Sequence, residues 1–422
     1  MDIKVPRRTV LKGLAAGAAT SIGLAKAPYV FARTKPVLRI LGTHVTLQED
    51  LRQQAMKDLG FEIQYQAKGS AAVLQKASML PSSFDLYEQW SNSIRLLWDA
   101  AAIQAIDKSR IENWGEINDL TKTGQLRANA TMGAGDAPHK ILNVQPDGSL
   151  SSKPSDKISF LPYVHNVDSF GYNTNVIPKG EPYKTESWGW LLDDEHRGRV
   201  ALVNAPTIGI FDMALAAQAK GLMSFADIGS MTRAEIDQLF TIFIEKKRQG
   251  HFAGFWNSVP ESVNFMKRGR VSIESMFSPA VASLNGQGIP VTYAAPKEGY
   301  RGWHGVMCLS SATEGTQKDA AYEYMNWWLS GWPGAFIARQ GYYISNPERS
   351  RELLTKDEWR YWYGGEATSA PLRGTDGKIS VQAGAQRTGG SYTKRFSNVA
   401  VWNTVMPTYD YSLQRWYDFI ST

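Results

Sequence analysis

Residues 37–65 have the sequence VLRILGTHVTLQEDLRQQAMKDLGFEIQY and contain the clearest indication of a fold. The apolar run 37–41 is typical of a short buried strand. A helical spacing of apolar residues follows, with Thr46 as the expected N-cap and Gly60 just beyond the end. Residues 61–65 return to the alternation of a strand. A strand, a helix and a strand in this order predict a parallel β-α-β unit.

The same alternation continues along the chain and predicts a second α/β region. A third strand of the first region is expected at 84–87. The second region has expected strands at 199–203 and 271–274 and a helix that a Thr232–Glu235 capping box opens, and a further helix is expected at 316–329. From Glu348 the tail is expected to be helical at first and irregular from 364 to 393. A chain of 422 residues normally divides into more than one compact body. We therefore expect an α/β protein with two lobes, each containing a mainly parallel sheet flanked by helices.

Sheets of this kind bind ligands beyond the carboxyl ends of their strands. Aromatic and polar residues that fall near such ends or near a crossover are therefore candidate ligand-binding residues. Any one aromatic there is more often part of the core, but several together favour a ligand site. The candidates are Thr43, His44, Trp90, Ser91, Tyr163, His165, Thr207, Trp256, Phe277, Ser278, Trp303 and His304.

The charge balance depends on the N-terminus. The whole chain carries a formal net charge of +6, with 46 Lys and Arg against 40 Asp and Glu. Residues 1–32 contain five of the basic and one of the acidic residues, so the remainder carries +2. A nearly neutral protein of ordinary composition, with 43% hydrophobic residues, gives no support to nucleic-acid binding. The single cysteine, Cys308, excludes an intrachain disulfide and a multi-cysteine zinc site.

The N-terminus has the pattern of an export signal. Arg7-Arg8 is followed by Leu11-Lys12 and an uncharged run at 13–25, which is too short to span a bilayer. This arrangement resembles the twin-arginine signal of proteins that are exported folded. A cleavage site after Ala32, with no cysteine for lipid attachment, predicts a periplasmic protein without a lipid anchor; a basic helix of a cytoplasmic protein is the alternative.

Sequence motifs for catalysis are missing from the chain. It contains no phosphate-binding loop, no Gly-x-Ser-x-Gly elbow and no His-Glu-x-x-His zinc motif. The six histidines are scattered, and the acidic pair Asp193-Asp194 is typical of a turn or helix start. We therefore expect no enzymatic activity, no cofactor and no metal.

Several short segments, taken in order, resemble the periplasmic solute-binding proteins of ABC importers, specifically the spermidine/putrescine-binding branch. They are Pro162-Tyr163, Gly171-Tyr172-Asn173, Trp188, Arg197–Leu202, Gly269–Ile273 and Pro296–Gly299. The resemblance implies a type II periplasmic-binding fold joined by crossover strands. It implies one lobe at 33–162 and 296–345 and a second at 163–295 and 346–422. The tail beyond about residue 348 has no counterpart in the resemblance.

The sequence departs from the polyamine-binding pattern of that branch. The family's acidic residues, which pair with the ammonium groups of a polyamine, fall here on Thr207, Ala280 and Gly305. Burying a di- or trication without carboxylates is costly. This disfavours a simple polyamine and favours an amine, a quaternary amine, or an amino-acid-like or opine-like solute held by aromatic rings. A neutral or anionic solute is equally compatible with His44, His165 and His304. With a different register, Glu88, Asp168 or Asp212 would supply the carboxylate instead.

The sequence thus predicts a monomeric receptor that closes on a small solute and delivers it to ABC importer permease subunits in the inner membrane. The alternative is a secreted enzyme, exported folded, whose site has no recognisable motif.

Overall fold

The structure of the protein is a computed structural model that describes residues 36–422. The predicted export signal at residues 1–32 lies outside the described residues. The strands are β1 (Val37–Gly42), β2 (Glu62–Ala67), β3 (Leu86–Trp90), β4 (Ile103–Gln104), β5 (Ile106–Asp107), β6 (Asn143–Val144), β7 (Leu150–Ser151), β8 (Lys157–Ile158), β9 (Leu161–Asn173), β10 (Val200–Val203), β11 (Phe252–Trp256), β12 (Ile273–Met276), β13 (Val291–Tyr293), β14 (Tyr300–Ser310), β15 (Tyr343–Ile344), β16 (Leu372–Arg373), β17 (Ile379–Val381) and β18 (Val399–Trp402). The α-helices are α1 (Glu49–Leu59), α2 (Ser70–Met79), α3 (Ile94–Asp99), α4 (Asp119–Thr123), α5 (Pro206–Ala219), α6 (Arg233–Arg248), α7 (Val259–Lys267), α8 (Ser278–Gly286), α9 (Gly315–Trp328), α10 (Trp332–Ala338), α11 (Pro347–Arg351), α12 (Lys356–Trp362), α13 (Tyr392–Phe396) and α14 (Tyr409–Ser421).

Most of the strands belong to one mixed sheet with the order β11-β10-β12-β9-β14-β3-β1-β2. The pairs β1–β2, β1–β3, β10–β11 and β10–β12 are parallel. The central pairs β12–β9, β9–β14 and β14–β3 are antiparallel. Each end of the sheet is therefore a small parallel sheet of the predicted kind.

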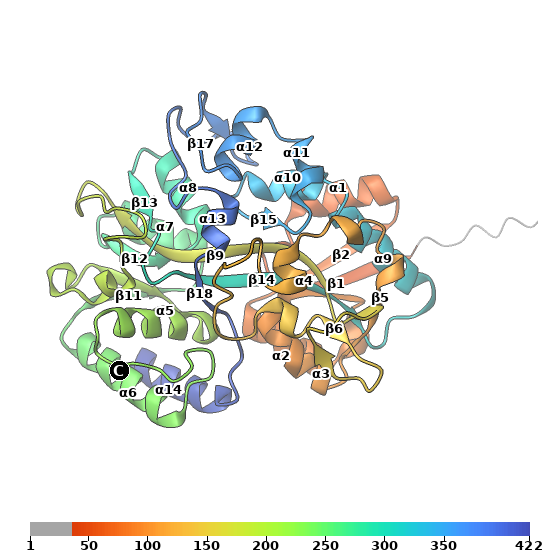
Figure 1. Cartoon of the computed structure of the whole chain (residues 1–422), viewed down its shortest axis with the longest axis horizontal. Helices are drawn as coiled ribbons and strands as arrows, with labels where there is room; N and C mark the ends of the chain where they lie inside the picture. Colours follow the sequence, from red (N-terminus) through yellow and green to blue (C-terminus); the bar gives the residue numbers. More distant parts are fainter. Residues whose placement is uncertain (1–35) are drawn as a thin grey trace, which may run out of the picture. The chain divides into compact units, whose positions relative to one another are not determined.

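The two long strands β9 and β14 join these halves (Figure 1). The first part of β9 pairs with β14, whereas its residues 169–173 pair with β12 and β13. In the same way β14 pairs with β9 near its start and with β3 near its end. Both strands are buried along almost their whole length. This confirms the prediction of two α/β halves connected by crossover strands.

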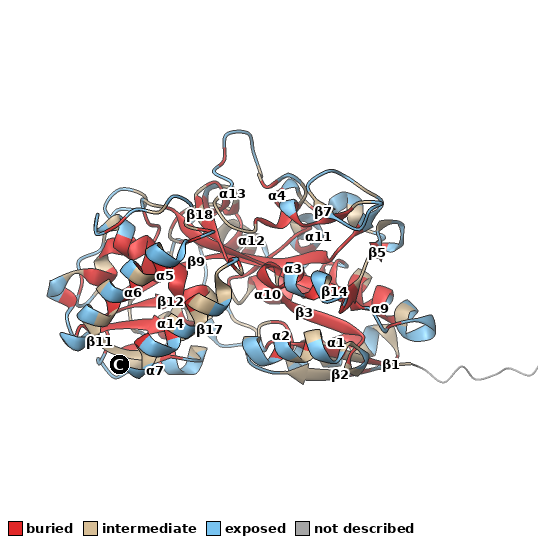
Figure 2. Cartoon of the chain, turned by 90° about the horizontal axis from the view of Figure 1, so that it is seen from below, coloured by how far each residue is buried: buried red, intermediate tan, exposed pale blue. Residues whose placement is uncertain are grey.

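Two large hydrophobic cores lie on either side of the crossover strands. The first is built from residues before 165 and between 303 and 344, and the second mainly from residues between 170 and 294. A third cluster combines residues such as Val167 and Tyr300 with the tail residues Trp362, Tyr392 and Trp402. Figure 2 shows the same arrangement, with buried strands inside and helices whose outer faces are exposed. The exact lobe boundaries stay a prediction.

The C-terminal tail is more ordered than the sequence suggested. Its helical start is confirmed as α11 and α12, but the stretch predicted as irregular contains β16, β17 and the start of α13. Further on, β18 pairs with β14, and Trp416 and Phe419 of α14 enter the second core. The tail is thus an integral part of the fold. Among the described residues, no helix is both long enough and apolar enough to cross a membrane.

The two helix caps predicted from local sequence had different outcomes. The Thr232–Glu235 capping box is present, with both of its reciprocal hydrogen bonds. The expectation that Thr46 caps the first helix was wrong, because α1 begins at Glu49 with Gln48 as N-cap. The hydroxyl of Thr46 instead lies 3.0 Å from that of Tyr163, so a tertiary contact has replaced the local one.

Candidate functional site

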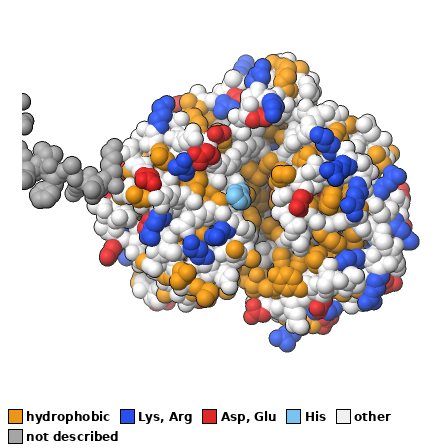
Figure 3. All heavy atoms as spheres, turned by 180° about the vertical axis from the view of Figure 1, so that it is seen from behind, with side chains coloured by type: hydrophobic (Ala, Val, Ile, Leu, Met, Phe, Trp, Pro, Cys, Tyr) orange, Lys and Arg blue, Asp and Glu red, His pale blue; other side chains and the backbone are white. Residues whose placement is uncertain are grey.

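A small cavity lies where residues of both halves meet, and we call it the central cavity. Its volume is about 20 Å³, which is room for about one water molecule, so the two halves are almost in contact there. On the face drawn in Figure 3, a groove runs between the halves with hydrophobic side chains along it. The residues that line the central cavity are Val45, Trp90, Asp168, Ile208, Phe277, Arg301, Trp303, Tyr342 and Asn403.

The topology explains why these residues converge. Trp90 is the last residue of β3, and Phe277 directly follows β12, so both stand at carboxyl ends of strands. Asp168 lies in the middle of β9, and Arg301 and Trp303 lie two residues apart on one face of β14. The central cavity is therefore formed by strand ends together with the two crossover strands.

Aromatic rings form much of the cavity wall. Trp303 packs edge-on against Tyr342 with ring centroids 5.4 Å apart, and Phe277 packs edge-on against Trp256 at 4.9 Å. Trp90 is half-buried and packs against the first core and against the cluster around Trp256 in the second half. Rings held in this way can stack on a ligand or hold an organic cation.

A buried ion-pair network forms the polar side of the cavity. The Arg301 guanidinium donates to Asp212 Oδ1 at 2.7 Å and to Asn403 Oδ1 at 3.2 Å, and its Nη1 lies 3.5 Å from Asp168 Oδ2. Arg301 and Asp212 are completely buried. Arg301 Nη2 and Asp212 Oδ2 have no hydrogen-bond partner within residues 36–422. Two carboxylates, those of Asp168 and Asp212, thus lie around one guanidinium. The guanidinium and the Asp212 carboxylate each have one polar atom without a partner among the described residues.

Burial shapes the ionisation of these carboxyl groups. It raises the pKa of Asp168 to about 6, against the opposing effect of the Arg301 charge, and it also raises the pKa of Asp212. When both carboxyl groups are ionised, the network of two carboxylates and Arg301 has a net charge of −1. A positively charged group beside Asp168 would compensate that excess.

Three of the predicted aromatic residues, Trp90, Phe277 and Trp303, line the central cavity. Predicted polar residues lie next to its walls in the chain: Ser91 and Ser278 are buried beside Trp90 and Phe277, and Thr207 is half-buried beside Ile208. Further out, Thr43 is buried and His44 is exposed in the segment that follows β1.

The remaining predicted residues are packed inside the protein and do not line the cavity. Tyr163 contacts Thr46 and Glu88, and Trp256 donates to the carbonyl of Ser275 at 3.0 Å. The stacked rings of His165 and His304 bond to Tyr392 and Thr121, at 2.7 and 2.8 Å. Burial lowers the pKa of His304 to about 4 and that of His165 well below its usual value, so both are neutral.

Two of the three positions that the resemblance matched with polyamine-pairing carboxylates leave little room for one. A Cβ atom on Gly305 would lie 2.7 Å from the carbonyl oxygen of Val164, and Ala280 is fully buried in a small apolar cluster. The carboxylate of the cavity is Asp168, which the sequence offered only as an alternative.

Sequence reasoning missed Arg301, Tyr342 and Asn403. Strand alternation could have identified Arg301, because it lies two residues before the predicted Trp303 and faces the same side. Asn403 follows β18 in the tail, so no local pattern connects it with the cavity.

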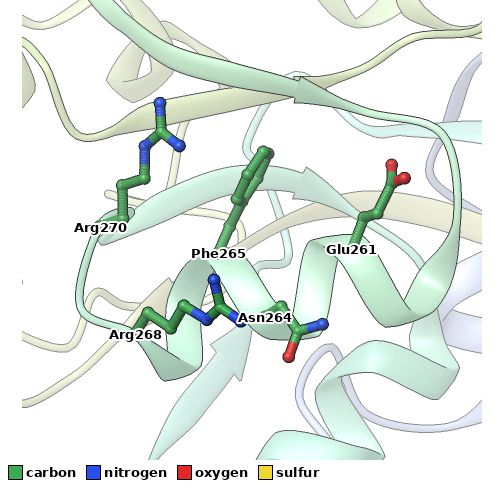
Figure 4. A pocket seen from close by; sticks show the side chains of 5 residues that line it. All are labelled: Glu261, Asn264, Phe265, Arg268 and Arg270. Carbon is green, nitrogen blue, oxygen red and sulfur yellow. The ribbon is translucent and has the colours of Figure 1, made fainter.

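Two other surface features do not form a comparable site. A pocket of about 220 Å³ beside α7 is lined by Glu261, Asn264, Phe265, Arg268 and Arg270 (Figure 4), and all of these residues except Phe265 are exposed. Among residues 36–422, one trio of possible metal ligands lies close together: Asp193, Glu195 and His196. There the ammonium group of Lys220 pairs with Asp193, so this carboxylate already has a cation.

Glu88 gives a testable pH effect near the cavity. Burial raises its pKa to about 7, compared with about 4.5 when exposed. The folded state therefore holds the carboxyl proton of Glu88 more tightly than the unfolded state does. As the pH rises from about 4.5 through 7, the free energy of unfolding falls by about 3 kcal/mol because of this group. We expect Glu88→Gln to be more stable than the parent at pH 8 and similar to it at pH 4, as measured by urea unfolding across this range. The exposed Glu62→Gln is the control, and parallel pH profiles for parent and Glu88→Gln would contradict the assignment.

The chain was compared with known proteins. The model of a family described as bacterial extracellular solute-binding protein matches residues 51–358. No curated protein sequence matches the chain. Similar solved structures include a putative spermidine/putrescine ABC transporter from Listeria monocytogenes, with a TM-score of 0.64, 14% identity, and coverage of 91% of this chain and 98% of that one.

Two further structures have the same fold. The spermidine/putrescine ABC transporter substrate-binding protein PotD from Streptococcus pneumoniae has a TM-score of 0.60 and 14% identity, over 91% of this chain and 99% of that one. The binding protein AgtB from A. tumefacien R10, in complex with agropinic acid, has a TM-score of 0.55 and 12% identity, over 92% and 99%. At such low identity these likenesses concern the fold alone.

Proposed function

We propose that this chain, which belongs to the family of bacterial extracellular solute-binding proteins, is the periplasmic receptor of an ABC importer for a small nitrogen-containing organic solute. In this proposal the solute is an amine, a quaternary amine, or an amino-acid-like or opine-like molecule. The receptor is exported by the twin-arginine-type N-terminus, acts as a monomer and delivers its ligand to permease subunits in the inner membrane.

The observation that carries the proposal is the central cavity, which joins aromatic rings from both halves to the Asp168–Arg301 pair. A ligand ammonium or quaternary nitrogen would lie against the rings and beside Asp168, where the network has excess negative charge. A ligand carboxylate, if present, would find the unused Nη2 of Arg301. AgtB is in complex with agropinic acid, so the fold accommodates ligands other than polyamines.

The proposed mechanism is closure of the two halves around the solute. Because residues of both halves line one cavity, a ligand there contacts both of them only in the closed state. It therefore shifts the equilibrium toward closure by those additional contacts. The volume of about 20 Å³ means that the halves must separate to admit a solute.

A thermal-shift screen tests this function. Amines, betaines, amino acids, opine-like conjugates and sugars are added separately to the purified chain. One nitrogen-containing class should raise the melting temperature by several degrees, because it binds only the folded state, and the compound should be recovered unaltered. A response to sugars alone would contradict the ligand class, and consumption of the compound would favour the enzyme alternative.

Removal of the cavity rings should weaken binding of the solute found in that screen. We expect Phe277→Ala and Trp303→Ala each to raise its Kd by up to about 30-fold, since one cation–ring contact contributes up to about 2 kcal/mol. Calorimetric titration measures this effect. Trp303→Phe, which retains a ring, should recover part of the affinity, and Trp98→Ala, remote from the cavity lining, should bind normally. Unchanged affinity in folded Phe277→Ala and Trp303→Ala would place both rings in a purely structural role.

A further inference from the structure

A second and larger cavity lies between α8, β13 and the C-terminal tail, and we call it the basic cavity. Its volume is about 410 Å³, within the range of pockets that hold small organic ligands. One wall comes from Ser278–Gly286 and the segment before and within β13, and the other from residues 361–395 of the tail. The strand β17 lies directly beside α8, as Figure 1 also shows.

The lining of the basic cavity is positively charged. It includes Lys179, Arg387 and Arg395 and contains neither aspartate nor glutamate. Lys179 is exposed, whereas Arg387 and Arg395 have exposed fractions of 7% and 1%. Burial lowers the pKa of Arg387 below its usual value. Buried cations without a carboxylate are costly, so this arrangement requires an explanation.

Neither buried arginine forms an ion pair within the described chain. Arg387 donates to the carbonyl oxygens of Trp362 at 3.0 Å and Gly341 at 2.7 Å, and its guanidinium lies 4.7 Å from the centroid of the Tyr343 ring. Arg395 donates to the carbonyl oxygens of Thr388 and Val167, at 2.8 and 3.3 Å. These neutral partners position the two cations, and they leave the charge of Arg387 without a compensating carboxylate in the described part of the chain.

Hydrogen-bonding capacity also remains on both side chains. A guanidinium has five N–H donors, and each of these two uses two of them in the bonds just described. The Nε of Arg395 is buried and has no acceptor among residues 36–422. A planar oxyanion would supply acceptors and the missing negative charge at once.

The basic cavity is distinct from the central cavity. Tyr293 separates them, since it lines the basic cavity while its hydroxyl lies 3.1 Å from Asp168 Oδ1. The positive charge of Arg395 also lowers the pKa of Asp168. Both arginines lie beyond residue 358, where the match with the family ends. The tail therefore supplies the two buried arginines, whereas the opposite wall at α8 and β13 lies inside the family match.

We propose that the basic cavity is a second binding site, specific for a small organic anion whose carboxylate or phosphate group binds to Arg387 and Arg395. The tail supplies both arginines, and α8 closes the opposite wall. The site goes beyond the proposed receptor function and does not depend on which solute enters the central cavity.

Calorimetric titration of the full chain at constant ionic strength tests the proposal. Citrate, succinate and glucose 6-phosphate are the organic anions, inorganic phosphate is the bare oxyanion, and glucose and putrescine are the uncharged and cationic controls. Ala282→Trp fills the cavity from α8 at a half-buried position, and Ala383→Trp is its control on an exposed part of the tail outside the lining. Arg387→Gln removes one charge and keeps amide donors for the two carbonyls.

We expect at least one organic anion to bind more tightly than inorganic phosphate, and Ala282→Trp and Arg387→Gln each to raise its Kd by at least 10-fold. Ala383→Trp and Trp303→Ala should leave anion binding unchanged, while Ala282→Trp leaves binding in the central cavity unchanged.

No binding by any anion, or equal binding by Ala282→Trp, would overturn the second site. Loss of anion binding in Trp303→Ala would assign the anion to the central cavity and also overturn it. Failure of the amine screen with retained anion binding would overturn only the receptor proposal.

Discussion

Replacing Arg301 by methionine is expected to lower the free energy of unfolding by about 3–5 kcal/mol. The substitution retains much of the side-chain volume but removes the charge that bonds to Asp212 Oδ1, at 2.7 Å, in a place where both residues are completely buried. Asp168 loses its 3.5 Å ion-pair partner at the same time. Two carboxyl groups then remain in the interior, and each must either ionise without a partner or take up a proton.

Urea unfolding of the single and double variants measures this effect. Arg301→Met combined with Asp212→Asn should recover a large part of the loss, because the second change removes a carboxylate that no longer has a partner. The cost of Arg301→Met should also shrink as the pH falls through about 6, the pKa of Asp168, because a protonated carboxyl group needs no cationic partner. Arg197→Met, in an exposed pair with Asp194, is the matched control and should cost less than about 1 kcal/mol. Additive effects of the Arg301 and Asp212 substitutions would contradict a coupled network.

Local sequence patterns were sufficient to predict the α/β architecture. Strands such as 37–41 and 199–203 and the Thr232–Glu235 capping box depend on neighbours within a few residues. A site near strand ends also follows from topology, and Trp90, Phe277 and the crossover-strand residue Trp303 line the central cavity. The predictions of these strands and of the capping box succeeded because spacing along the chain determines them, whereas the ligand site stays a prediction.

Other features depend on contacts between distant segments, which no local pattern reports. Tyr163 and Trp256 occur near strand ends as Trp90 does, but their polar atoms bond to Thr46 and Ser275 inside the protein. Asn403 reaches Arg301 only because β18 pairs with β14. The Gly- and Ser-rich stretch at 364–393 has weak periodicity, although packing against α8 orders it as β17.

The C-terminal helix provides the second large effect, because Trp416→Ala is expected to cost about 3–5 kcal/mol of stability. The Trp416 ring is 1% exposed and packs edge-on against Phe240 of α6 and Phe419 of its own helix. Its Nε1 donates to Asn204 Oδ1 at 3.0 Å. Truncation would leave a cavity in the second core and remove that hydrogen bond.

The adjacent Tyr417 is the matched control, since it lies on the same helix but is 61% exposed. Tyr417→Ala should change the free energy of unfolding by less than about 0.5 kcal/mol. Trp416 also holds the junction between β10 and α5, because Asn204 follows β10 and a Cβ on Gly209 would lie 2.3 Å from the Trp416 ring. That junction carries Ile208 of the central cavity, so Trp416→Ala should weaken solute binding as well as stability, whereas Tyr417→Ala should affect neither. Equal stabilities of the two variants in urea unfolding would mean that the last helix is not part of the second core.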